Sequence, residues 1–95
     1  MRSYELMIIH RPEMAESDVQ TQIGELERAI AESGSVTTTD HWGKRRFAYE
    51  INHLTEGYYS VVDFEAELDM VERLDRALGL SDAVVRHKIV RRGAD

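Results

Sequence analysis

The sequence contains no cysteine among its 95 residues, and this absence removes several kinds of chemistry at once. Without thiols the chain forms no disulfide, offers no thiolate to a metal ion and has no cysteine nucleophile. A reducing cytosolic environment fits this composition, because disulfide-rich small domains belong to oxidising compartments.

Long apolar segments are also missing. No stretch approaches the ~18–20 consecutive apolar residues that a membrane helix needs. The longest early apolar run extends from Leu6 to Ile9, which is too short for the hydrophobic region of a signal peptide. With a methionine start and no export signal, we expect a cytoplasmic protein.

Basic residues are outnumbered by acidic ones. There are 12 Lys and Arg against 18 Asp and Glu, for a formal net charge of −6. Taken as a total, this charge opposes nucleic-acid binding, since phosphate binding requires a basic surface. The hydrophobic fraction of 42% and the charged fraction of 32% are those of an ordinary folded protein. A chain of this length builds one core, so we expect a single domain over residues 1–95 without a linker.

Hydrophobic periodicity predicts six elements in the order β-α-β-β-α-β. Strands are expected at residues 4–10, 35–51, 58–64 and 84–90. The first strand carries apolar residues in both alternation phases, which is typical of a central strand covered on both faces. We expect Gly43 to mark a bulge or bend in the second strand, and residues 52–57 to form a hairpin turn. The order predicts an α+β, ferredoxin-like fold, in which a four-stranded antiparallel sheet carries two helices on one face.

Two apolar stripes at helical spacing mark the helices. The stripes consist of Val19, Ile23, Leu26 and Ile30 in the first helix, and of Val71, Leu74 and Leu78 in the second. Ser17 and Asp69 each precede a Gln or Glu by three residues, the spacing of a capping box at a helix start. Gly34 and Gly79 predict the two helix ends, where a glycine commonly adopts the left-handed conformation.

The charge is distributed unevenly along the chain. Residues 13–32 and 63–82, which contain the predicted helices, carry thirteen acidic and three basic side chains, a net charge of −10. The rest of the chain carries nine basic and five acidic side chains, a net charge of +4. Because both helices cover one face in this fold, positive charge remains for the other face and the strand edges. Such a separation favours a module that turns one side towards phosphate, although two solvated acidic helices are also common in cytosolic domains.

Strand alternation indicates which residues share the open face of the sheet. In the last strand, Arg86 and Lys88 share one face. In the third strand, Tyr59 and Val61 are assigned to the open face, because the alternating residues 60, 62 and 64 follow the core pattern. In the second strand, alternation groups Trp42, Lys44, Arg46 and Ala48 on one side and Arg45, Phe47, Tyr49 and Ile51 on the other. An open face that combines aromatic, aliphatic and basic groups is typical of a docking surface.

Four sequence blocks and the order of elements resemble one known family. The blocks are Arg2-Ser3-Tyr4-Glu5, Gly43-Lys44-Arg45-Arg46-Phe47-Ala48-Tyr49-Glu50-Ile51, Glu56-Gly57-Tyr58-Tyr59 and Val84-Val85-Arg86-His87-Lys88-Ile89-Val90-Arg91. Over essentially its whole length the chain is similar to the bacterial small-subunit ribosomal protein S6 (S-six) family. The resemblance implies a structural constituent of the small ribosomal subunit that binds the central domain of 16S rRNA as a heterodimer with ribosomal protein S18 (S-eighteen).

Arginine is well suited to RNA, because its guanidinium group binds phosphate with two hydrogen bonds. With the resemblance, the candidate RNA-binding residues are Arg2, Lys44, Arg45, Arg46, Arg86, Lys88, Arg91 and Arg92. The third strand only distantly resembles an RNA-recognition motif, because Ser60 stands at the position of the stacking aromatic residue. We therefore assign the aromatic residues to partner contact or to the core. The candidate partner-binding residues are Tyr4, Trp42, Tyr49 and Tyr59.

Catalysis finds no support in the sequence. The four histidines, His10, His41, His53 and His87, lack the spacing of metal ligands, and there is no glycine-rich phosphate loop or nucleophile motif. We expect no catalytic residue, no metal and no cofactor. The alternative function is a ferredoxin-like small-molecule regulatory domain that forms a homodimer, which leaves the basic clusters unexplained.

Overall fold

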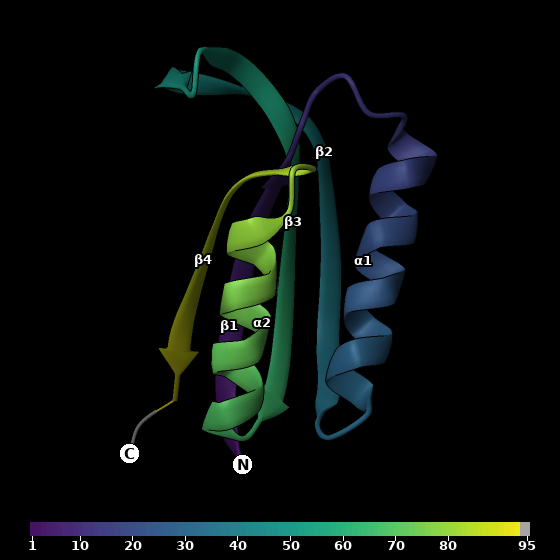
Figure 1. Ribbon diagram of the computed structural model, residues 1–95, viewed down its shortest axis with the longest axis vertical. Helices are drawn as coiled ribbons and strands as arrows, with labels where there is room; N and C mark the ends of the chain where they lie inside the picture. The colour runs from purple at the N-terminus through teal and green to yellow at the C-terminus, as the bar shows by residue number, and fades with distance from the viewer. Residues whose placement is uncertain (94–95) are drawn as a thin grey trace.

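The computed structural model describes residues 1–93 and confirms the predicted order of elements. The elements are β1 (Arg2–His10), α1 (Glu16–Ala31), β2 (Ser35–Ile51), β3 (Leu54–Ala66), α2 (Leu68–Leu80) and β4 (Val84–Arg92). The strands form one antiparallel sheet in the order β2-β3-β1-β4. Both helices cover the same face of this sheet, which leaves the second face open (Figure 1). The predicted ferredoxin-like fold is therefore confirmed.

The hydrophobic core lies between the helices and the two central strands. Its most buried apolar members are Leu6, Ile8, Ile23, Ile30, Val62 and Phe64. The predicted stripe of α1 is buried at all four positions, whereas α2 buries Met70, Val71 and Leu74. At about 1.5–3 kcal/mol for each large apolar side chain that is fully buried, this layer supplies most of the stabilisation.

The predicted helix caps are wrong, although the helices themselves are confirmed. Ala15 and Glu67 are the N-cap residues, and neither helix start has a side-chain cap hydrogen bond. Acidic side chains in both first turns are instead favourable near the positive end of the helix dipole. Gly34 has no positive φ, and Gly79 lies inside α2, which ends at Leu80. The capping-box spacing and the glycines therefore indicated the approximate positions of the helix ends, but not the residues or the backbone conformations that form the caps.

The hairpin that joins β2 and β3 is longer than predicted. The strands extend to Ile51 and from Leu54, so that only Asn52 and His53 form the turn. Both turn residues have positive φ, as two-residue hairpin turns that match the strand twist require. The expected bulge at Gly43 is confirmed by a φ of +82° and by a register shift between His41 and Gly43.

The end of this hairpin bends towards the side of β4 (Figure 1), and Ile51 at this end shares a depression of the open face with Met7 and Ile9. The side-chain amide of Asn52 donates a hydrogen bond of 3.4 Å to the backbone carbonyl of Val85 at the start of β4. Ile51 lies beside Ile9, which is only 3% exposed although its side chain belongs to the open face. The hairpin therefore provides the second cover of β1 that the apolar residues in both phases predicted.

His10 is a buried polar residue at the end of β1. Its side chain is 1% exposed, and its Nδ1 has no hydrogen-bond partner among the described residues. Burial lowers the pKa of His10 from its ordinary value of 6.5, because desolvation disfavours the charged imidazolium. The unfolded chain then binds more protons than the folded chain at mildly acidic pH, so stability falls as the pH decreases through about 6.5.

We expect the His10→Gln variant to lose less stability than the unmodified chain when the pH is lowered from 7 to 5. Urea unfolding at several pH values measures the difference in slope. His53→Asn is the matched control, because His53 is exposed in the turn and asparagine tolerates its positive φ. An unchanged pH slope in His10→Gln would show that His10 does not contribute to the acid sensitivity.

Candidate nucleic-acid and partner interface

The open face of the sheet contains a groove that runs across the central strands towards β4. One depression of about 300 Å³ is lined by Glu5, Met7, Trp42, Val61, Lys88 and Val90. A second of about 240 Å³ includes Met7, Ile9, Ile51, Tyr59, Arg86 and Lys88 in its lining. The two depressions share Met7 and Lys88, which pair across β1 and β4, so we treat them together as the open-face groove.

Aromatic rings form the β2 side of the open-face groove. Trp42 and Tyr59 stack with ring centroids 6.1 Å apart and an interplanar angle of 9°. Phe47 meets Tyr59 edge-on at 5.9 Å. Arg45 fixes this cluster from above, since its Nε donates a 3.0 Å hydrogen bond to the carbonyl of Trp42 and its guanidinium lies 5.8 Å from the Trp42 ring. Trp42 remains 45% exposed, so a large aromatic surface is presented beside an apolar floor.

The bulge at Gly43 explains why this arrangement differs from simple alternation. The ring of Trp42 lies on the same side of β2 as the Arg45 side chain, and not on the side that carries Lys44. Lys44 instead lies over the ring of Tyr58, with its Nζ 5.2 Å from the ring centroid. The predicted grouping of Trp42 with Lys44 is therefore wrong, because the extra residue at a β-bulge reverses the alternation beyond it.

The four candidate partner-binding aromatic residues do not form one cluster. Trp42 and Tyr59 border the open-face groove. Tyr4 is 5% exposed and stacks on Phe64 with the ring centroids 5.7 Å apart. Its position therefore fits a residue of the hydrophobic core. Tyr49 is 85% exposed near the hairpin end and lines neither depression.

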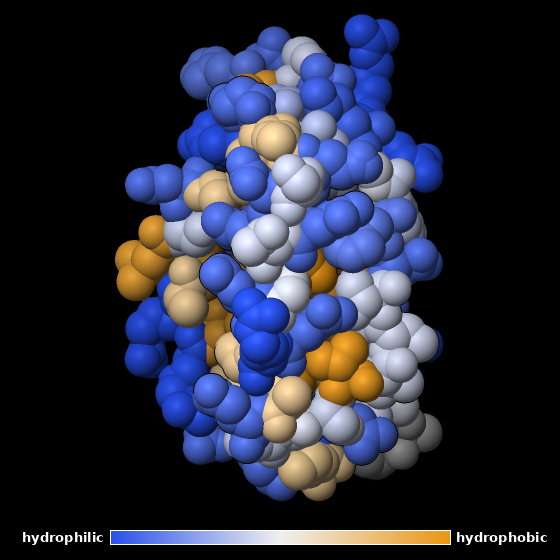
Figure 2. Space-filling view, turned by 90° about the vertical axis from the view of Figure 1, so that its right-hand side faces the viewer, coloured by the Kyte–Doolittle hydropathy of each residue, from blue (hydrophilic) through white to orange (hydrophobic). Residues whose placement is uncertain are grey.

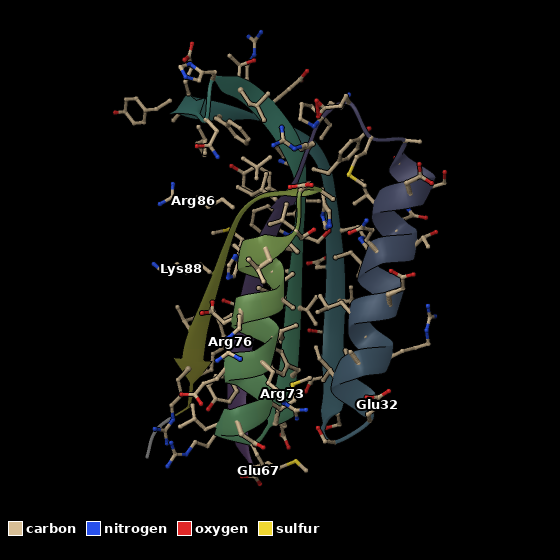
Figure 3. All side chains as sticks on the ribbon, viewed as in Figure 1. Glu32, Glu67, Arg73, Arg76, Arg86 and Lys88 are labelled. Carbon is tan, nitrogen blue, oxygen red and sulfur yellow. The ribbon has the colours of Figure 1, made fainter. Side chains whose placement is uncertain are left out.

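Two cations of β4 stand at the edge of the open-face groove. Arg86 and Lys88 point outward from β4, away from α1 (Figure 3). Neither side chain makes a hydrogen bond or an ion pair with any of residues 1–93. Arg92 lies on the same face, but its Nη1 is 3.3 Å from both Glu5 and Asp63, so its charge is largely compensated within the chain. Arg86 and Lys88 are thus the open-face cations that remain available to phosphate.

The other candidate RNA-binding residues occupy two further places. Lys44, Arg45 and Arg46 lie on the hairpin, where the side chain of Arg46 has no hydrogen bond or ion pair within the described chain. Arg2 and Arg91 line a depression at the edge between β4 and α2, together with the acidic residues Glu72 and Asp75. The eight predicted residues are therefore divided among the open face, the hairpin and the helix side of the sheet.

The helix side of the molecule carries charged side chains of both signs. Figure 2 views the molecule from the side of α1 and shows a largely hydrophilic surface with apolar residues as separate spots. The first turns of both helices carry acidic side chains, and the cations Arg73 and Arg76 lie on α2 (Figure 3). The separation of charge that the sequence suggested is therefore only partial, because Arg2 and Arg91 lie on the helix side and the acids Glu5 and Asp63 pair with Arg92 on the open face.

The sequence analysis did not identify several apolar residues that line the open-face groove. Met7 and Val90 form part of the floor, and Ile51 closes the upper end above Ile9. The second apolar phase of β1 was the available signal, because it required a cover on the open face. The bent hairpin that provides this cover has no comparable signal in the sequence.

Within residues 1–93, no group of three or more His, Cys, Asp or Glu side chains is placed to hold a metal ion. Neither helix of this part of the chain is long and apolar enough to cross a membrane.

Comparison with known proteins assigns the family. The family model described as ribosomal protein S6 matches residues 3–91. The small ribosomal subunit protein bS6 of Carboxydothermus hydrogenoformans is 47% identical over 92 residues, which is 96% of each chain. That of Beutenbergia cavernae is 49% identical with the same coverage. The crystal structure of 30S ribosomal protein S6 from Thermotoga maritima superimposes with a TM-score of 0.89 at 28% identity, covering 96% of this chain and 87% of that one. These relatives are structural ribosomal proteins and not enzymes, and the chain belongs to the ribosomal protein S6 family of the small ribosomal subunit.

Proposed function

We propose that the chain binds the central domain of 16S rRNA together with ribosomal protein S18, as a heterodimer, in the cytoplasmic ribosome. The observation that carries this proposal is the open-face groove, in which an apolar and aromatic floor lies beside Arg86 and Lys88. An apolar patch of this kind favours a protein partner, and unpaired cations beside it favour phosphate.

The partner contact is assigned to the apolar part of the open-face groove. Trp42 and Tyr59 are held by each other and by Phe47, so a partner would meet a surface that is already ordered. Such preorganisation lowers the entropic cost of association, and aromatic residues are enriched where binding energy concentrates. We expect apolar side chains of S18 to cover Met7 and Val61 between them.

The RNA contact requires help from the partner. A net charge of −6 repels RNA at long range, although local cations favour it. A basic partner docked beside Arg86 and Lys88 would supply additional positive charge and extend the surface that releases counterions from the RNA. Binding of the two proteins and of the RNA is therefore expected to be coupled, with reciprocal gains in affinity.

We expect the mixture of this chain and S18 to bind a labelled fragment of the 16S rRNA central domain at least tenfold more tightly than this chain alone, a coupling of about 1.4 kcal/mol or more. Fluorescence anisotropy at about 0.15 M salt, with S18 alone as the control, measures the difference. Tight binding by this chain alone that S18 leaves unchanged would contradict the cooperative function. A concentration-dependent homodimer with a ligand-induced rise in Tm would favour the regulatory-domain alternative instead.

A further inference from the structure

Tyr49 is the most exposed aromatic side chain among the described residues, and it stands apart from the other rings of the hairpin. It is 85% exposed, and no ring contact or hydrogen bond joins its side chain to any of residues 1–93. Phe47 and Trp42, by contrast, both pack on Tyr59. The function assigned to the open-face groove therefore does not account for Tyr49.

The backbone around Tyr49 bulges outward from the hairpin. Arg46 pairs with Glu56 and Ile51 pairs with Leu54, so the four residues 47–50 lie opposite Thr55 alone. A bulge of this kind bends the strand and redirects side chains, and such features are common next to functional sites. Residues 47–50 are therefore the segment of the hairpin that projects beyond regular strand pairing.

This projecting segment is anchored at both ends. On one side the ring of Phe47 packs against Tyr59 at 5.9 Å. On the other side Ile51 lies against the open face, and Asn52 donates its hydrogen bond to the carbonyl of Val85. Tyr49 is consequently presented from a fixed backbone, which lowers the entropic cost of placing its ring against a ligand.

The charge around Tyr49 favours RNA over protein as its ligand. Residues 44–53 carry Lys44, Arg45 and Arg46 against a single acid, Glu50. Exposed rings among cations are the usual means of binding single-stranded nucleic acid, because every base offers a face for stacking. A protein partner would need a continuous apolar area, but the neighbours of Tyr49 are the exposed Ala48 and Glu50.

We propose that Tyr49 stacks on an unpaired base of the RNA while Arg46 contacts a phosphate of the same strand. The inference rests on the proposed RNA-binding function and deepens it, by adding an RNA contact on the hairpin to the one proposed for Arg86 and Lys88 beside the open-face groove. Arg46 and Tyr49 are three residues apart, at most about 10 Å along an extended chain, so both can reach one short single-stranded segment.

The test compares Tyr49→Ala, Tyr49→Leu and Tyr49→Phe in the complex with S18 and the central-domain RNA fragment. We expect Ala and Leu to weaken RNA affinity about tenfold and Phe to retain it within about twofold, because stacking needs an aromatic face and not the hydroxyl. The affinity for S18 without RNA should not change in any variant. Since Tyr49 is 85% exposed and its side chain makes no ring contact or hydrogen bond with any of residues 1–93, all three variants should fold with an unchanged Tm.

Three results would overturn the inference while leaving RNA binding by the complex intact. These are full RNA affinity in Tyr49→Ala, full RNA affinity in Tyr49→Leu, or a loss that occurs in S18 binding without RNA. The last result would place Tyr49 in the protein interface. If the unmodified complex itself fails to bind the RNA fragment, the proposed function fails and the inference fails with it, so the two failures are distinguishable.

A spectroscopic readout tests stacking directly. In a Trp42→Phe background, Tyr49→Trp places the only indole of the chain at the hairpin. We expect RNA to quench its fluorescence in the complex and S18 alone to leave the fluorescence unchanged. Because Trp42 borders the open-face groove, the Trp42→Phe background is first shown to bind S18 and the RNA as the unmodified chain does. Quenching by S18 alone, or no quenching by RNA, would then overturn the stacking.

Discussion

Replacing Gly34 with alanine is expected to lower the free energy of unfolding by about 3 kcal/mol, a large effect for one methyl group. A Cβ at Gly34 would overlap the backbone carbonyl oxygen of Glu65 and would lie 3.2 Å from the Cβ of Ala66. The backbone cannot easily retreat. Gly34 N–H donates a 2.8 Å hydrogen bond to Ile30 at the end of α1, and Ser35 already pairs with Glu65. Relief of the overlap therefore requires that the end of α1 or the first rungs between β2 and β3 be lost.

Gly24→Ala is the matched control for Gly34→Ala. The nearest atom to a Cβ at Gly24 is a guanidinium nitrogen of Arg28 at 3.7 Å, an ordinary contact with a flexible side chain. Because glycine costs about 1 kcal/mol relative to alanine inside a helix, Gly24→Ala should stabilise the fold by about that amount. If the close approach of the backbone requires glycine at position 34, urea unfolding should show a lower free energy of unfolding for Gly34→Ala and a higher one for Gly24→Ala. A stability of Gly34→Ala equal to that of the unmodified chain would contradict the steric argument.

The core and the order of elements could be predicted from the sequence because both depend on local periodicity. Val19, Ile23, Leu26 and Ile30 repeat at helical spacing, and one face of one helix suffices to bury all four. The alternation at residues 60, 62 and 64 placed three core positions correctly for the same reason. Such patterns need no knowledge of which distant segment provides the other half of the contact.

The helix ends could not be predicted in the same way, because one residue type serves several purposes. Ser17 and Asp69 have the chemistry of caps, but each lies within the first turn of its helix. Gly34 was expected at a left-handed helix stop. Its actual constraint is a close approach to β3, a contact between segments about thirty residues apart in the sequence.

The candidate site was predictable in its components but not in its arrangement. Arg86 and Lys88 were assigned to one face by alternation, and the structure places both there. Arg92 was counted with them, but Glu5 and Asp63 from two other strands compensate its charge. The pairing depends on strand register, which the sequence alone does not specify.

Charge reversal of Arg86 and Lys88 is expected to have the largest effect on RNA binding. If each contacts a phosphate, the double variant Arg86→Glu/Lys88→Glu removes two attractive contacts and adds two repulsive ones beside the RNA. We expect the affinity of the complex with S18 for the central-domain fragment to fall about 50-fold at about 0.15 M salt. The affinity for S18 without RNA is measured in parallel, because both residues border the open-face groove.

Arg73→Glu/Arg76→Glu is the control that separates local contact from net charge. Both double variants change the total charge of the chain by the same four units, but Arg73 and Arg76 lie on α2 in the helical layer (Figure 3). The salt dependence of RNA affinity distinguishes local contact from net charge.

Loss of two phosphate contacts should reduce the slope of log K against log salt by about 1.4–1.8, because fewer counterions are released on binding. The control should keep the original slope, since charges on the far side act only through a screened field. Equal affinity losses with unchanged slopes in both variants would mean that net repulsion alone governs binding, and that the open-face cations do not contact RNA. A reduced slope confined to Arg86→Glu/Lys88→Glu would instead identify the open face as the side that meets phosphate.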